Sequence, residues 1–113
     1  MKKNDIRLNY KMRALRLALG LTQEEVGELI GCSNVVISLY ERGVTDSSFA
    51  HNIASTLYGV KQRMVDKNGY WYDCYIELQT ALHEMQVWQD MQGYVPEHIL
   101  KNAKTLAAAF SNS

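Results

Sequence analysis

The sequence predicts an all-α protein, and three observations lead to this prediction. Apolar residues recur every three or four positions in every long segment, which is the spacing of one helical face. Gly residues stand where these patterns stop, as they do after helices. Polar residues that favour helix starts follow two of these Gly residues. The expected helices span about residues 6–19, 22–30, 33–42, 48–58, 72–92 and 96–110, and no strands are expected.

The first expected helix has one apolar face and a clear end. Its apolar residues are Leu8, Met12, Leu15 and Leu19, at spacings of four, three and four. Gly20 follows, and a Gly after a helix commonly takes the left-handed conformation that ends it.

The second and third helices form a pair around a glycine turn. Thr22 caps the second helix, and Glu25 completes a capping box with it. Gly31 makes the turn, and the small residue Gly27 lets the third helix pack closely. Ser33 caps that third helix. The buried positions of the pair are expected to be Val26, Leu29, Ile30, Ile37 and Tyr40.

The chain after Gly43 predicts a fourth helix over residues 48–58 and then a short fifth one. Gly59 is expected to close the fourth helix, and the segment VKQRM to begin the fifth. Candidate caps for the fourth helix are Asp46, Ser47 and Ser48.

The second half predicts an antiparallel helical hairpin, because only a short break separates two apolar-striped helices. Pro96 suits the first turn of the last helix. The turn signal Asn68-Gly69 comes before the hairpin and leaves a small pair of strands open as an alternative. The stripe of the long helix is expected to contain Tyr75, Leu78, Leu82, Met85, Trp88 and Met91. The stripe of the last helix is expected to contain Ile99, Leu100, Ala103, Leu106, Ala107 and Phe110.

Composition bounds the class of protein. The chain has 113 residues, 47% of them hydrophobic, which suits one domain or a small domain with an appendage. Residues 1–63 hold nine Lys or Arg against six Asp or Glu, whereas residues 64–113 hold three against six. The basic half suits a polyanion. No membrane span and no signal peptide are expected. Cys32 and Cys74 are expected to be reduced thiols in a cytosol.

The stretch LRLALGLTQEEVGELIGCSNVVISLYERG, residues 15–43, resembles the phage-repressor family of helix-turn-helix regulators, of Cro/cI or XRE type. The resemblance implies a lambda-repressor-like five-helix DNA-binding domain over residues 1–63, which binds double-stranded operator DNA as a homodimer. The chain is then a sequence-specific transcriptional regulator, expected to be a repressor and not an enzyme. Its expected location is the cytoplasm of a bacterial cell, on the nucleoid when bound to DNA. No cofactor is expected.

The outward side of the third helix is the expected DNA-reading surface. On a wheel of about 100° per residue, Val35 and Leu39 lie about 160° from buried Ile37. In the family this side lies in the major groove, where Asn34 would pair with adenine and the apolar side chains would contact thymine methyl groups. The alternative is that Val35 and Leu39 pack on another part of the protein. The expected base contacts are Ser33, Asn34, Val35, Val36 and Leu39.

The resemblance also assigns contacts outside the bases. Gln23, Arg42 and Arg13 are expected to contact DNA phosphates, Gln23 with help from the positive end of its helix. Arg16 and Glu41 occupy positions that form a structural ion pair in the family. A general phosphate-attracting surface, or else a solvated charge run, is expected from Lys2, Lys3, Arg7, Lys11 and Arg13.

Other chemistry finds little support in the sequence. No metal site is expected, because the following residues lack metal-ligand spacing: His51, His83, His98, Cys32 and Cys74. The aromatic run from Tyr70 to Tyr75 lies in the acidic half, which favours core packing or a protein interface over stacking on single-stranded bases.

The acidic half predicts an assembly module, with residues 64–71 as a linker and 72–113 as the hairpin. Two helices cover only part of each other, so the hairpin must dock on residues 1–63, on a second copy, or on a different protein. Residues 1–66 alone are expected to fold. The alternative function is a protein-interaction module, an adaptor or antirepressor, that has lost DNA binding. The expected oligomer contacts are Tyr75, Leu78, Leu82, Met85, Leu106 and Phe110.

Overall fold

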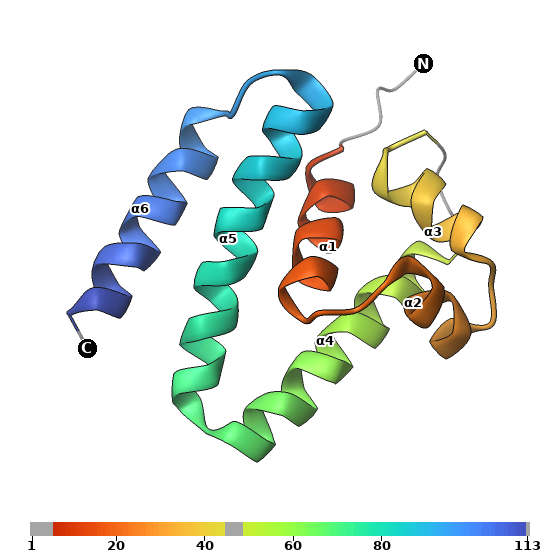
Figure 1. The fold of residues 1–113 in the computed structure, drawn as a ribbon, viewed down its shortest axis with the longest axis horizontal. Coiled ribbons are helices and arrows are strands. Elements are labelled where there is room, and N and C mark those ends of the chain that lie inside the picture. The colour runs from red at the N-terminus through yellow and green to blue at the C-terminus, as the bar shows by residue number, and fades with distance from the viewer. Residues whose placement is uncertain (1–5, 45–48, 113) are drawn as a thin grey trace.

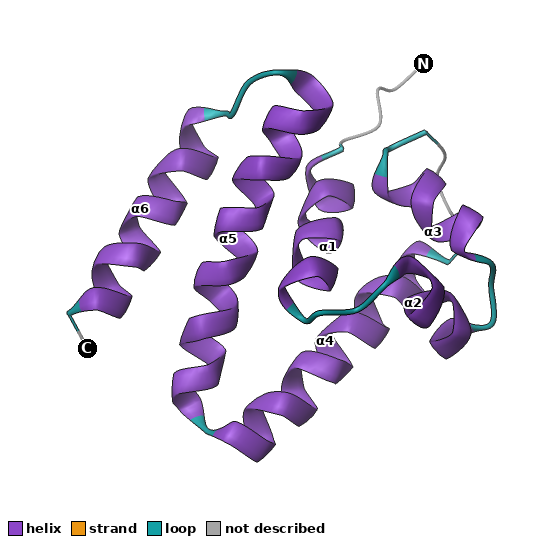
Figure 2. Ribbon diagram, in the orientation of Figure 1, coloured by secondary structure: helices purple, strands orange, loops and turns teal. Residues whose placement is uncertain are grey.

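The computed structural model describes residues 6–44 and 49–112, and within them helices are the only regular secondary structure. The helices are α1 (Arg7–Ala18), α2 (Gln23–Ile30), α3 (Asn34–Glu41), α4 (Ala50–Asn68), α5 (Tyr70–Gln92) and α6 (Glu97–Ser111) (Figures 1 and 2). The all-α prediction is therefore confirmed, and the two strands that Asn68-Gly69 left open do not form.

The helices are arranged as a thin slab of 42 × 34 × 20 Å. In Figure 1, α1 lies between α5 and the α2–α3 pair, and α6 runs antiparallel to α5 along its outer side. Helix α3 and helix α6 consequently lie toward opposite ends of the long axis. The most extensive helix–helix contact is between α1 and α5. The C-terminal hairpin therefore docks on the N-terminal half of the same chain.

Helix α1 ends in two backbone hydrogen bonds around a glycine. Leu21 donates its backbone N–H to the Arg16 carbonyl at 3.1 Å, and Gly20 donates to the Leu17 carbonyl at 3.1 Å. This pair of bonds is a Schellman motif, and it needs the left-handed conformation that Gly20 adopts with φ of 75°. The predicted end of α1 is confirmed.

Helix α4 is longer than the sequence predicts. The sequence predicts that a helix over 48–58 ends at Gly59 and that a short fifth helix follows. This prediction is wrong, because α4 runs unbroken to Asn68. Gly59 is not among the glycines with positive φ, and a helical Gly costs only about 0.5–1 kcal/mol relative to Ala. Beyond Gly59, Lys61 forms ion pairs with Asp73 and Glu77 of α5. These ion pairs favour continuation of α4 past Gly59. The candidate caps Asp46, Ser47 and Ser48 lie outside the described residues.

The predicted linker over residues 64–71 is also wrong. Residues 64–68 form the last turn of α4, and Tyr70 already begins α5. Gly69 alone makes the corner between these two helices, with φ of 92° and ψ of 178°. A left-handed φ of this kind suits Gly, so the turn signal is real but marks a corner between helices.

Two clusters of buried side chains make up the core. The first joins α1 to α4 and also includes Ile76 of α5: its buried members are Met12, Leu15, Val26, Ile37, Tyr40, Ile53, Leu57 and Ile76. The second joins α1 to the hairpin through Tyr10, Val87, Trp88 and Ile99. Because α1 and α5 each supply members to both clusters, the N-terminal helices and the hairpin pack against each other through both of them.

This docking corrects several predicted burial positions. Leu8 and Leu29 were expected to be buried but are 53% and 56% exposed. On α1, the positions buried in addition to the predicted face are Tyr10, Ala14 and Arg16. The buried positions of α5 are Ile76, Thr80, Ala81, Glu84, Val87 and Trp88. Of the predicted α5 stripe only Trp88 is fully buried, because α1 and α6 contact this helix from two sides.

Candidate nucleic-acid interface

Helices α2 and α3 meet at a tight turn that small residues permit. A Cβ atom on Gly27 would lie 2.5 Å from the Cys32 carbonyl oxygen, so only Gly fits there. Gly31 is left-handed, with φ of 77°, and ends α2. Ser33 caps α3 by accepting the Val36 backbone N–H at 3.4 Å. Each of these features agrees with its prediction from the sequence.

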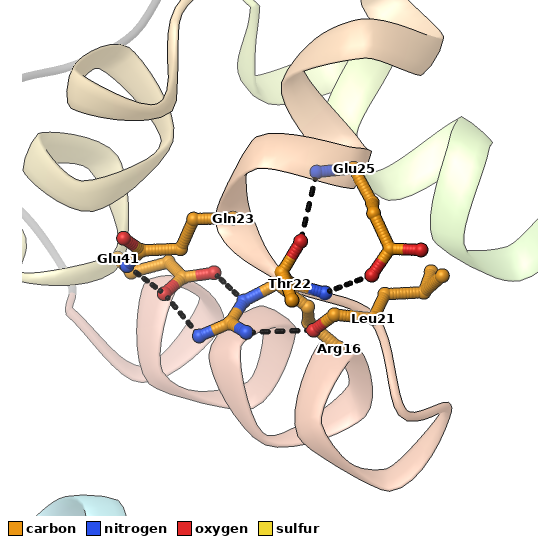
Figure 3. Close-up of polar contacts among 6 residues, drawn as sticks. All are labelled: Arg16, Leu21, Thr22, Gln23, Glu25 and Glu41. Carbon is orange, nitrogen blue, oxygen red and sulfur yellow. Dashed lines mark hydrogen bonds and ion pairs between the residues drawn. The ribbon is translucent and has the colours of Figure 1, made fainter.

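The start of α2 is fixed by a reciprocal pair of hydrogen bonds. The Glu25 backbone N–H donates to Thr22 Oγ1 at 3.0 Å, and the Thr22 N–H donates to Glu25 Oε1 at 3.0 Å. The predicted capping box is therefore present (Figure 3). Hydrogen bonds from the Thr22 backbone and side chain lower the pKa of the Glu25 carboxyl, so this carboxylate stays charged at the positive end of α2.

Helix α3 presents one face to the core and the opposite face outward. Ile37 and Tyr40 are 0% and 3% exposed and anchor the helix on the first core cluster. Val35, on the other side, is 58% exposed. Among the five expected base-contacting residues, three are exposed (Ser33, Asn34 and Val35) and two are half-buried (Val36 and Leu39). Val35 consequently points away from the rest of the chain, whereas Leu39 is partly covered.

A buried carboxylate ties α3 to α1 and α2. Glu41 is 1% exposed. It accepts Arg16 Nε at 2.6 Å on one oxygen and Arg16 Nη2 at 3.0 Å on the other (Figure 3). Arg16 also donates Nη1 to the Leu21 carbonyl at 2.8 Å. The ion pair that the family resemblance implies is present, and it fixes the orientation of α3 relative to α1.

Gln23 joins the same network. Its Nε2 donates to Glu41 Oε1 at 3.0 Å (Figure 3), which places the amide at the junction of α2 and α3. The sequence singled out Gln23 as a phosphate contact and Glu41 as a partner of Arg16, but it missed this bond between the two. The signal that would have found it is spatial, because the two residues lie on different helices.

A hollow of about 660 Å³ opens beside these residues, between α1, the start of α2 and the start of α3. Arg13, Gln23 and Asn34 all line it. The Nε of Arg13 is buried and has no hydrogen-bond partner among the described residues. Arg42 is exposed at the other end of α3 and does not line this hollow. Two of the three expected phosphate contacts therefore lie close to an expected base contact.

The basic residues of α1 do not form one continuous surface. Arg7 and Lys11 line a second hollow of about 410 Å³ with Glu84 of α5 and His98 of α6. Burial raises the pKa of the Glu84 carboxyl, whereas the charges of Lys11 and His98 act to lower it. The charge of Lys11 thus acts partly on this buried carboxyl of the hairpin. Lys2 and Lys3 lie outside the described residues.

The expected oligomer contacts remain partly exposed in the single chain. Tyr75, Leu82 and Phe110 are 38%, 44% and 38% exposed. The other three, Leu78, Met85 and Leu106, are half-buried. A shallow apolar hollow of about 170 Å³ lies beside Leu82 and Met85, where α5 meets α6. Apolar surface therefore remains on the hairpin after α6 has packed on α5.

The described part of the chain offers neither a metal-binding cluster nor a membrane-spanning helix. Within it, no three His, Cys, Asp or Glu side chains are grouped as a metal ion would need. None of its helices is both long enough and apolar enough to cross a membrane.

Comparison with known proteins gives one match. Residues 12–51 match the family model described as helix-turn-helix. The matched segment extends from Met12 in α1, through α2 and α3, to His51 in the first turn of α4. No curated protein and no solved structure matches the chain.

Proposed function

We propose that this chain, whose residues 12–51 match the helix-turn-helix family model, is a sequence-specific repressor of XRE type that binds its operator as a dimer. Helix α3 acts as the recognition helix in the major groove. The proposal includes the cytoplasm as the site of action. The observation that carries it is the outward face of α3, where Asn34 and Val35 are exposed while Ile37 and Tyr40 are held in the core.

The chemistry of that face favours A·T base pairs. An Asn side chain can bond adenine N6 and N7 together, and apolar side chains contact the thymine methyl group. Asn34 and Val35 stand next to each other at the start of α3, the end of a recognition helix that usually contacts base edges. Ser33, Val36 and Leu39 flank them. We infer an operator half-site that contains at least one A·T pair opposite Asn34.

The hollow beside α3 suits a phosphate of the DNA backbone. Arg13 lines the hollow and brings a positive charge to it, and Gln23 stands at the N-terminus of α2, where backbone N–H groups favour anions. Arg42, exposed at the far end of α3, suits a phosphate on the other side of the groove. The Arg16–Glu41 pair has a structural role, because both side chains are buried.

The dependence of DNA affinity on salt tests the proposal. Each neutralised phosphate contributes about −0.9 to the slope of log affinity against log salt. We expect a steep negative slope, and Arg13→Gln should make it shallower by about one phosphate. Lys104→Gln, an exposed lysine on α6, is the matched control and should leave the slope unchanged. A flat response in the unchanged chain would instead favour the protein-interaction module, for which the exposed apolar side chain of Val35 is the supporting feature.

The dimer part of the proposal rests on the apolar face of the hairpin. The expected contacts on α5 fall on one side of this helix together with Trp71, and none of them carries a charge: Tyr75, Leu78, Leu82 and Met85. Leu106 and Phe110 of α6 complete the expected contacts. Depletion of charge is typical of the centre of protein interfaces, and the same patch on two copies can meet across a two-fold axis. A dimer would engage two half-sites about 34 Å apart, or a multiple of that spacing.

Sedimentation of the full-length chain tests this assembly. We expect a dimer at micromolar concentration, and Leu82→Glu should make it a monomer because it places a charge in the contact. Thr105→Glu puts the same side chain on an exposed position of α6 outside the apolar face and should leave the dimer intact. A chain that stays monomeric at high micromolar concentration would point to a different protein as the partner of the hairpin.

A further inference from the structure

A separate hollow lies at the other end of the hairpin, where the first turns of α5 face the last turns of α6. Its volume is about 400 Å³, within the usual range for small-molecule sites. Tyr70 and Phe110 form aromatic walls, and Leu106 and Ala109 add aliphatic surface from α6. Phe110 is held near Tyr75, with 6.5 Å between the ring centroids. The hollow is therefore largely apolar and partly built from aromatic rings.

Its charged groups are all of one sign. Asp73 and Glu77 line the hollow, and none of the described Lys, Arg or His residues lines it. Lys61 of α4 forms ion pairs with both carboxylates, at 3.1 Å to Asp73. One ammonium group balances only one of the two carboxylates, so the hollow keeps a net negative charge. Both carboxylates are also partly exposed, so they remain accessible to a second cation.

The hollow is separate from the DNA-reading face, and it shares only Leu106 and Phe110 with the expected oligomer contacts. Helix α3 lies toward the opposite end of the slab from α6 (Figure 1). Around the axis of α5, Asp73 and Glu77 lie about 180° and 140° from Leu82, on a wheel of about 100° per residue. A ligand here would contact neither the DNA-reading face nor the centre of the dimer face.

We propose that this hollow is a binding site for a small hydrophobic organic cation, such as an aromatic quaternary ammonium compound. Aromatic faces attract cations, and the apolar walls accept the hydrophobic part of such a ligand. The carboxylates of Asp73 and Glu77 set the sign of the charge and disfavour an aromatic anion. The site does not depend on DNA binding and stands apart from it.

Titration of the full-length chain with benzyltrimethylammonium, followed by nuclear magnetic resonance, tests the proposal. We expect saturable shifts of the backbone amides of Cys74, Ala109 and Phe110, which surround the hollow. Benzenesulfonate, an aromatic anion of similar size, should leave these amides unshifted. Equal shifts with the anion, or shifts spread evenly over the surface, would overturn the proposal.

Variants separate the charge from the shape of the site. Asp73→Asn combined with Glu77→Gln should weaken cation binding about tenfold or more, since two charge interactions are lost. Leu106→Trp should abolish binding by filling the hollow while both carboxylates and Lys61 remain. Asp90→Asn, on an exposed part of α5 outside the hollow, should bind the cation unchanged. Unchanged affinity in both site variants would rule the site out, as would binding that disappears when the chain dimerises, because a second copy would then fill the hollow.

Discussion

The ring of Tyr10 in α1 meets the ring of Trp88 in α5 edge-on, with 5.0 Å between the ring centroids and 84° between their planes. The Tyr10 hydroxyl also accepts a hydrogen bond from Gln92 Nε2 at 2.8 Å. These contacts join the first helix of the helix-turn-helix region to the far end of α5. The C-terminal hairpin therefore helps to stabilise the helix-turn-helix region.

Loss of the Tyr10 ring should destabilise the whole chain. We expect Tyr10→Ala to lower the free energy of unfolding by about 3–5 kcal/mol, as removal of a buried aromatic ring does. Tyr58→Ala, at a 42% exposed position on α4, is the control and should cost much less. Urea denaturation followed by circular dichroism measures both.

A fragment of residues 1–68 lacks Trp88 and the rest of the hairpin that covers Tyr10. This fragment should therefore be largely unfolded, which revises the expectation that residues 1–66 fold alone.

The buried ion pair should be costly to break from one side. Arg16→Met leaves the Glu41 carboxylate buried without its guanidinium, and we expect a loss of about 3–5 kcal/mol. Replacing both partners, as Arg16→Met with Glu41→Leu, should cost less than the two single changes added together, because no isolated charge remains. Glu77→Gln, in the half-exposed pair with Lys61, should cost about 1 kcal/mol or less. A double variant that costs the full sum would contradict this account.

Two helical glycines should respond to Ala with opposite signs. Gly27→Ala places a Cβ 2.5 Å from the Cys32 carbonyl oxygen, so α3 must move, at a cost of about 1–3 kcal/mol. Gly59→Ala meets only Arg63 Nη1 at 3.7 Å and should stabilise α4 by about 0.5–1 kcal/mol. Thermal unfolding of the two variants beside the unchanged chain decides the point. Stabilisation by Gly27→Ala would show that the turn is looser than the structure has it.

Stability should fall as pH rises through the titration of Glu84. Burial raises the pKa of this carboxyl above its ordinary value of 4.5, against the opposing charges of Lys11 and His98. The unfolded chain therefore loses this proton first, and the free energy of unfolding decreases between 4.5 and the folded-state pKa. Glu84→Gln should remove that decrease. Glu25 should have the opposite effect, because hydrogen bonds from Thr22 lower the pKa of its carboxyl. The stability that Glu25 contributes is lost as pH falls, and Glu25→Gln should remove this loss. Urea titrations across this range test both variants.

The two expected classes of DNA contact should be separable by substitution. Gln23→Ala should weaken binding to all sequences about equally, because a phosphate contact carries no sequence information. Asn34→Ala should instead relax the preference at one base pair, at a cost of about 1–3 kcal/mol of discrimination. Affinity measured on an operator and on its single-base variants distinguishes these outcomes. A change of preferred base in Gln23→Ala would show that the assigned docking is wrong.

The sequence by itself determined the local architecture. The capping box of Thr22 and Glu25, the left-handed Gly20 and Gly31, and the inward Ile37 all follow from interactions within a few residues of the chain. Such short-range rules also identified the helix-turn-helix pair. The outward position of Val35 follows from helical periodicity alone, because a residue two positions before a buried one lies on the other side of the helix.

The tertiary structure decided which faces are covered. Leu8 satisfies the periodicity of α1 yet is exposed, whereas Tyr10 is buried because Trp88, far along the chain, packs against it. Gly59 is a residue type that often follows the end of a helix, but it lies inside α4. Packing of α4 against α5 outweighs the small local cost of a helical Gly. Gln23 and Glu41 become partners only when α2 and α3 are brought together. Local propensities differ by about 1 kcal/mol or less per residue, whereas burial of one large side chain contributes more, so long-range packing decides where the two conflict.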